Sequence, residues 1–161
     1  MSFDEKIIMA SRKKSLATKY IKQKAYKRAK KTLSIIKEIV QMNVTEKEQI
    51  IMAKPLNISC LSNFALCCWK LEEWVTLDKT CNEILELDVF NYKAFYRKML
   101  ANHKIQNYEF VESTIQDYLD ENQSKKDSDD MKELIELLKK NTTDYKNHVD
   151  KEKQIYKNMF G

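Results

Sequence analysis

Two basic side chains near the middle of the chain, Lys93 and Arg97, stand four residues apart in the segment NYKAFYRK. Residues at this spacing lie on the same face of a helix, so the two cations point to the same side. A Lys and an Arg held together can bind an anionic group through charge-assisted hydrogen bonds of roughly 1.5 to 3 kcal/mol each. The chemistry to expect is therefore recognition of an anion, by this pair and by whatever groups the fold places beside it.

Other kinds of site are disfavoured by the residue types that the chain has. Its only Gly is Gly161, so no glycine-rich loop can hold the phosphates of a nucleotide. The cysteines form no CxxC pair and lie far in sequence from both histidines; they are Cys60, Cys67, Cys68 and Cys81. We expect buried, reduced thiols, with no metal and no cofactor. Because no Ser/His/Asp or Cys/His arrangement is recognisable, we also expect no catalytic activity in this chain.

The composition favours one all-α domain. One Gly and one Pro in 161 residues is very few, while helix formers such as Lys, Glu, Leu and Ile are abundant. The N-terminal segment MSFDEKIIMASRKK lacks the apolar stretch of a signal peptide, and no apolar run reaches roughly 18 residues. We therefore expect a cytoplasmic or nuclear protein that does not engage a membrane.

Basic residues are concentrated at the start of the chain. Residues 1–42 hold 12 Lys or Arg and 3 acidic residues, a net charge of +9, whereas the whole chain has a net charge of +5. The first helices should therefore attract anions, and both an acidic peptide and a nucleic acid fit that charge. The aromatic residues of this region, Tyr20 and Tyr26, sit at core spacing, which disfavours a stacking platform for nucleic-acid bases.

A pair of amphipathic helices recurs in the middle of the chain. The segments ISCLSNFALCCWKL and WVTLDKTCNEILEL have apolar residues at helical spacing and are joined by a tight turn at Glu72 and Glu73. Equivalent positions then return after 34 residues: Trp74 and Tyr108, Leu77 and Val111, Cys81 and Ile115, Ile84 and Tyr118. A period of 34 residues is that of the tetratricopeptide repeat, a helix-turn-helix unit.

An earlier copy of the pair precedes these two, with the same internal spacing in ASRKKSLATKYIKQKAYKRAKKTLSIIKEI. We predict repeats at about residues 10–43, 58–91 and 92–125, stacked as a right-handed superhelix in a single domain of residues 1–161, because one pair alone cannot bury its apolar face. The 14 additional residues around NVTEKEQIIMAKP are expected to form a helix extension and a linker that ends at Pro55.

A long amphipathic helix is expected at about residues 128–159, after a polar connector. Its apolar positions are Met131, Leu134, Ile135, Leu138, Tyr145, Val149 and Tyr156. This stripe should cover the last repeat. An alternative is a helix offered to calmodulin, because KNHVDKEKQIYKNMF has Lys residues among spaced apolar ones, although it also contains Asp150 and Glu152.

Stacked pairs of this type form a concave groove that is lined by the first helix of each pair. The polar residues that these helices are expected to send into it are Lys14, Thr18, Asn63, Lys70, Lys93 and Arg97. The set has four cations and two neutral hydrogen-bonding groups, and it has no acid. Such a lining suits a short peptide with several carboxylates.

The segments NFALCCWKLEEW and NYKAFYRK and the ending KEKQIYKNMF resemble the C-terminal tetratricopeptide domain of FKBP-type immunophilins, with cyclophilin-type immunophilins second. The resemblance implies a two-carboxylate clamp for the C-terminal MEEVD of heat-shock protein 90. Of the five clamp groups in that family, Lys14, Asn63, Lys93 and Arg97 match, and Thr18 stands where the family has Asn. The resemblance also implies a peptidyl-prolyl isomerase domain upstream of this segment.

Three alternatives to this partner stay open at the level of the sequence. The groove could take the acidic tail of heat-shock protein 70 or another acidic peptide. The basic first helix pair could bind nucleic acid. A dimer is also permitted by exposed apolar residues at Met159 and Phe160.

Overall fold

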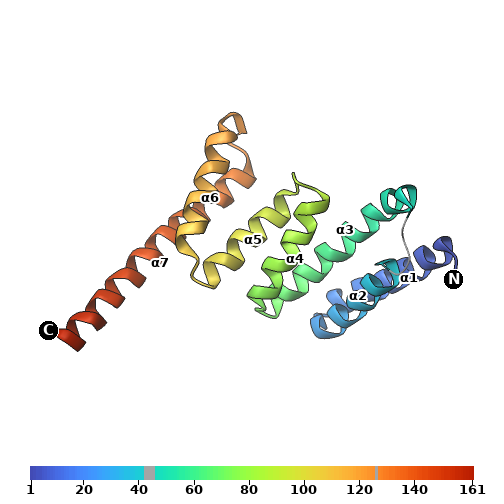
Figure 1. Ribbon diagram of the computed structural model, residues 1–161, viewed down its shortest axis with the longest axis horizontal. Helices are drawn as coiled ribbons and strands as arrows, with labels where there is room; N and C mark the ends of the chain where they lie inside the picture. The colour runs from blue at the N-terminus through green and yellow to red at the C-terminus, as the bar shows by residue number, and fades with distance from the viewer. Residues whose placement is uncertain (42–45, 126) are drawn as a thin grey trace. The chain divides into compact units, whose positions relative to one another are not determined.

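The chain is described here by a computed structural model that covers residues 1–41, 46–125 and 127–161. All regular structure in these ranges is helical, which confirms the all-α prediction. The elements are α1 (Phe3–Lys22), α2 (Tyr26–Gln41), α3 (Lys47–Lys70), α4 (Trp74–Leu87), α5 (Tyr92–Lys104), α6 (Tyr108–Glu121), a 3₁₀ turn η1 (Gln123–Lys125) and α7 (Asp129–Phe160) (Figure 1).

The chain divides into two compact units, residues 1–98 and residues 99–161, and each is considered by itself. In the first unit α1 packs against α2, α2 against α3, and α3 against α4. Helix α1 also touches α3, so the leading helices of the first two pairs are neighbours (Figure 1). The stacking of all three pairs into one superhelix stays a prediction.

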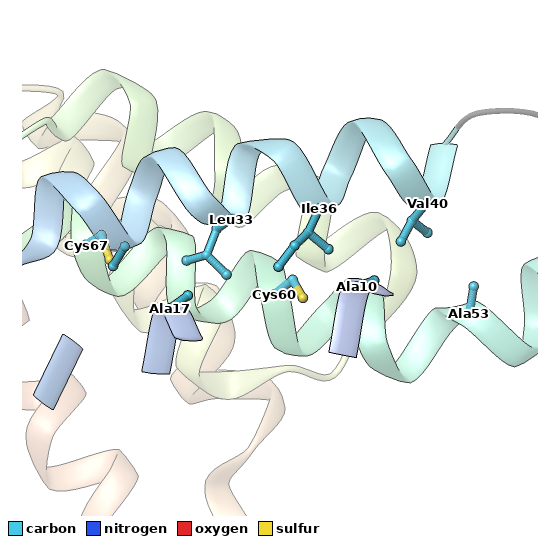
Figure 2. Close-up of a cluster of buried hydrophobic side chains, with 9 residues drawn as sticks. Ala10, Ala17, Leu33, Ile36, Val40, Ala53, Cys60 and Cys67 are labelled. Atoms are coloured by element: carbon cyan, nitrogen blue, oxygen red, sulfur yellow. The ribbon is translucent and has the colours of Figure 1, made fainter. Parts of the chain in front are cut away.

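Small and branched apolar side chains build the core of the first unit. Its buried members are Ala10, Ala17, Ala29, Leu33, Ile36, Val40, Ala53, Cys60 and Cys67. Figure 2 shows Leu33 and Ile36 of α2 pointing toward Cys60 on α3. The alanines of α1 and α2 let these helices approach closely. Truncating one of the large core residues, Leu33 or Ile36, to Ala typically costs about 2 to 5 kcal/mol.

The same type of turn connects the two helices of each pair. Lys24, Glu72 and Gln106 have φ angles of 58°, 57° and 66°, the left-handed conformation that usually belongs to Gly. In every case the turn residue donates its N–H three residues back, and the next residue donates five residues back, as in Ala25 N to Tyr20 O at 2.8 Å. These two bonds satisfy carbonyl groups at the end of the first helix, so the turn repeats without glycine.

Helix α3 begins earlier than the sequence indicated. The predicted linker ending at Pro55 is wrong from Lys47 onward, because α3 starts there and passes through Pro55. Proline cannot donate to the carbonyl of Ile51, but Ile51 is 68% exposed, so water can reach that turn of the helix. The part of the predicted linker at residues 42–45 lies outside the described residues.

Helix α3 is also long and apolar enough to cross a membrane by length and composition alone, with a mean hydropathy of 1.3. A core helix of a globular protein passes the same test. Helix α3 packs against both α2 and α4, but only 28% of its most apolar window is buried, so core packing accounts for part of its apolar composition.

In the second unit α7 is held to the α5–α6 turn by a buried polar cluster. The His103 ring, 5% exposed, has Nδ1 at 2.9 Å from Asn141 Oδ1 and Nε2 at 3.1 Å from Asp144 Oδ2. Asn141 Nδ2 donates to the backbone carbonyl of Tyr108 at 2.9 Å. These bonds orient the first half of α7 against α6, where Met131 and Leu134 are buried.

The second half of α7 has no such cover within the described residues. Its apolar stripe was expected to pack over the last repeat, yet Tyr156 is 67% exposed and Phe160 is 72% exposed. Figure 1 shows α7 continuing beyond the first turn of α6, which explains the difference. The stripe is therefore buried only where α6 lies beside it.

The repeated turn generates a stability prediction. Lys24→Gly should raise the free energy of unfolding by about 1 kcal/mol, because Gly adopts a positive φ angle without the strain of a side chain. The matched control is Lys31→Gly, which removes an exposed lysine from the middle of α2 and should lower stability by about 1 kcal/mol. Chemical denaturation measures both; equal effects of the two substitutions would contradict the assigned turn.

Candidate functional site

All six predicted groove residues lie in the first unit, on the leading helix of a pair. Lys14 and Thr18 are on α1, Asn63 and Lys70 on α3, and Lys93 and Arg97 on α5. Their side chains differ in burial: Arg97 is buried, Lys14, Thr18 and Asn63 are half-buried, and Lys70 and Lys93 are exposed. The site is described below from the most buried group outward.

Arg97 is a buried cation at 8% exposure. Its Nη1 donates to the backbone carbonyl of Ser62 on α3 at 3.1 Å, and its Cζ lies 5.7 Å from the centre of the Trp69 ring. Burial lowers the pKa of the guanidinium, because removal from water disfavours its charged form. Among the described residues no carboxylate pairs with Arg97, so its neighbours offer it only a neutral oxygen and an aromatic face.

Several other lysines of this unit do have acidic partners. Lys37 pairs with Glu83 at 2.6 Å, Lys30 pairs with Glu73, and Lys98, the residue after Arg97, lies 3.5 Å from Asp78. Each of these pairs joins α2 or α5 to α4 or to Glu73, the residue that precedes α4. These lysines have acidic partners, whereas Arg97, Lys70 and Lys93 of the candidate site have none among the described residues.

Lys93 and Lys70 are the exposed cations of the site. Neither pairs with an acidic side chain in the part of the chain that the structure describes. The Nζ of Lys70 lies 5.5 Å from the centre of the Trp69 ring. Trp69 therefore has a cation near it from α3 itself and another, Arg97, from α5, each within the distance of a cation–π interaction.

On α1, Lys14 and Thr18 stand one turn apart. The charge of Lys14 acts on Cys60 of α3 by lowering the pKa of that thiol, although burial has the larger effect and raises it to about 11. Lys14 is therefore on the side of α1 that faces α3. The Oγ1 of Thr18 donates to the backbone carbonyl of Lys14 at 3.0 Å, which uses its only hydrogen.

Asn63 follows Ser62, whose carbonyl accepts the bond from Arg97. Its carboxamide has no hydrogen-bond partner among the described residues, so both its donor and its acceptor are available. The structure thus brings Arg97 of α5 and Lys70 of α3 to the same Trp69 ring. The meeting of Lys14, Thr18, Asn63 and Lys93 with these two in one groove stays a prediction.

Sequence reasoning missed two groups of this site. Trp69 was noted only as part of a motif, yet it provides the surface over which Arg97 and Lys70 lie. Its position directly before Lys70 was the available signal, since aromatic faces attract cations. The Ser62 carbonyl had no signal, because a backbone acceptor cannot be recognised from residue type.

The four cysteines are free and buried, as predicted. Burial raises the pKa of Cys60 and Cys67 to about 11 and of Cys68 and Cys81 to about 12. The thiolate is the form that attacks electrophiles and binds metals. At neutral pH these groups are therefore unreactive packing residues.

Comparison with known proteins gives the family context of this geometry. No protein-family model matches the chain. FK506-binding protein 59 of Drosophila melanogaster is 29% identical to it over 160 residues, which are 99% of this chain and 34% of that protein. The peptidyl-prolyl cis-trans isomerase FKBP4 of Bos taurus is 27% identical over 164 residues, again 99% of this chain and 34% of the relative.

A solved structure shares the fold. The C-terminal TPR-containing domain of an FK506-binding protein from Plasmodium falciparum superposes with a TM-score of 0.70 at 20% identity, covering 98% of this chain and 97% of that one. The fold is thus a tetratricopeptide helical repeat, and the similarities fit a C-terminal tetratricopeptide domain of an FKBP-type immunophilin, as the sequence motifs implied. The chain spans about a third of the length of the curated relatives. Its residues correspond to the repeat domain and not to an isomerase domain.

Proposed function

We propose that this chain is a co-chaperone interaction domain, whose groove binds the acidic C-terminal tail of heat-shock protein 90 and so recruits an attached FKBP-type isomerase. The observation that supports it most strongly is the buried Arg97 guanidinium without an acidic partner in the described part of the chain. A charge removed from water is costly unless it is paired, so a carboxylate supplied by a ligand would complete this site.

In the proposed complex the tail lies along the leading helices. Its terminal carboxylate meets Lys14 and Asn63 beside Thr18, its last aspartate meets Lys93 with Lys70 nearby, and Arg97 contacts a residue further back in the peptide. Several ionic contacts are offset by the cost of ordering a disordered tail, so we expect an affinity of around 1 µM, about −8 kcal/mol. The association should weaken as salt is added.

The proposal extends to the whole protein that contains this domain. Such a protein would act in the cytoplasm or nucleus, where the chaperone tail is accessible, and the isomerase activity would belong to another domain. Thr18 bears on the choice of tail. Its hydroxyl donates to the backbone carbonyl of Lys14, so it offers an incoming carboxylate no donor. A different acidic tail, such as that of heat-shock protein 70, is the second candidate.

Lys93→Ala tests the site directly. Because Lys93 is exposed and has no acidic partner among the described residues, the substitution should leave the fold intact and weaken binding of an MEEVD peptide roughly tenfold. The matched control is Lys79→Ala, which removes an exposed lysine from α4 and should leave the affinity unchanged. Isothermal titration calorimetry measures both, and equal affinities for all three proteins would refute the proposed groove.

Thr18→Asn tests the proposed place of the terminal carboxylate. A carboxamide supplies a donor that the Thr18 hydroxyl cannot, so the variant should bind the free-acid peptide several-fold more tightly, a gain of about 1 kcal/mol. A peptide with an amidated C-terminus is the control and should gain nothing. An equal gain for the two peptides would show that the terminal carboxylate does not lie beside this residue.

A further inference from the structure

A cleft that the proposed peptide site does not use runs between α2 and α4, with α3 as its floor. One part of it has a volume of about 290 Å³ and is lined by buried side chains that include Leu33, Ile36 and Cys60. The ion pair of Lys37 with Glu83 joins α2 to α4 at its rim. This part of the cleft is therefore bridged by charged groups of the protein itself.

The cleft continues toward the start of α3, where it is open. A second hollow of about 440 Å³ adjoins the first, since both are lined by Val40 and Asn57. Its apolar lining includes Ile50 and Ile51, which are 50% and 68% exposed, together with Leu87 at the end of α4. No described side chain fills this end of the cleft.

Two apolar side chains project from the chain two and three residues after Leu87. Val89 is 72% exposed and Phe90 is 95% exposed. A phenylalanine so open to water is unusual, because burying its ring is strongly favourable. The same end of the unit thus presents a projecting ring and, a few residues away in the sequence, an open apolar hollow.

From this combination we infer that the chain forms a two-fold symmetric dimer, in which Phe90 of each copy enters the open end of the cleft of the other. An interface of this kind needs a surface that is complementary to itself, with the projecting group and its receptor on one patch. Phe90 and the hollow meet that requirement. In such a dimer the exposed ring would be buried and the open hollow would be filled.

Size and charge agree with this occupant. A cavity of roughly 150 Å³ is enough to bind benzene, so a hollow of about 440 Å³ accepts a phenyl ring with room for the side chain of Val89. The rim has one cation, Lys54, and one anion, Glu86, so two identical patches meet without a net charge opposing them. A second copy of the chain therefore fits better than a strongly acidic or basic partner.

The dimer surface and the peptide site share no residue. None of the six groove residues lines the cleft, and neither Phe90 nor Ile51 belongs to the groove. Dimerisation and peptide binding can therefore fail or succeed independently in an experiment.

Sedimentation equilibrium of the purified chain over a concentration series tests the dimer. The wild type should show reversible association to a dimer. Phe90→Ser removes two rings from each interface and should weaken the dimer about a hundredfold, since one buried anchor ring contributes about tenfold. Because Phe90 contacts almost nothing in the single chain, this variant should keep its helical content and its thermal midpoint.

The receptor side has a matched pair of variants on one helix. Ile51 and Met52 are neighbours in α3 and are both 68% exposed, but Ile51 lines the hollow and Met52 does not. Ile51→Glu should abolish the dimer, because it places a charge in the apolar hollow, and Met52→Glu should leave it intact.

Three results would overturn the inference. They are a wild type that stays monomeric up to about 1 mM, a dimer that Phe90→Ser leaves unchanged, and an equal loss of dimer in Ile51→Glu and Met52→Glu. Affinity for the acidic peptide should be the same in all of these variants.

Discussion

The constraint on which this structure depends is that a single helix pair is too thin to bury its own apolar face. Helix α2 therefore packs against both α1 and α3, and α3 packs against α2 and α4. Packing in this order uses the second helices and one side of the leading helices. Polar residues of α1 and α3 that are not needed for packing are then left on the remaining side of these helices, which is where the proposed groove would place Asn63 and Lys70.

Arg97 contributes to helix packing and is also part of the proposed binding site. Its bond to the Ser62 carbonyl and its position over Trp69 attach the middle of α5 to α3, so it has a structural role. Its charge, however, is more than that role requires, because a neutral donor could serve a backbone carbonyl equally well. By contrast, Lys30, Lys37 and Lys98 each form an ion pair with an acidic residue, as Lys37 does with Glu83. The absence of such an acid at Arg97 within the described residues is the observation on which the proposed anionic ligand depends.

Much of the fold could be predicted from the sequence, because repeats make the same physical demand several times. The recurrence of apolar positions after 34 residues located the helix pairs, and the left-handed turn at Glu72 returns at Gln106 with the same period. Prediction failed where one local exception outweighed the pattern. Pro55 lies within a helix because the turn before it is exposed, and Tyr156 stays exposed because α6 begins beside Tyr145 and runs back toward the start of α7.

The candidate site was predictable in its residue types and less so in its contacts. Periodicity placed Lys93 and Arg97 on one face of a helix, but it could not indicate that Arg97 would be buried, since burial depends on the neighbouring helix. The role of Trp69 and the internal hydrogen bond of Thr18 likewise follow from side-chain geometry. Residue types therefore predicted what the site could bind, while the structure showed which groups are still unpaired in the described residues.

The most direct test of the central claim is the NMR signal of the Arg97 side-chain Nε–Hε group during titration with an MEEVD peptide. The unpaired buried guanidinium should gain a carboxylate, so this signal should shift and saturate with the acidic peptide, and it should stay in place with a peptide whose carboxylates are all replaced by amides. Saturable binding of the acidic peptide without any change at Arg97 would contradict the account.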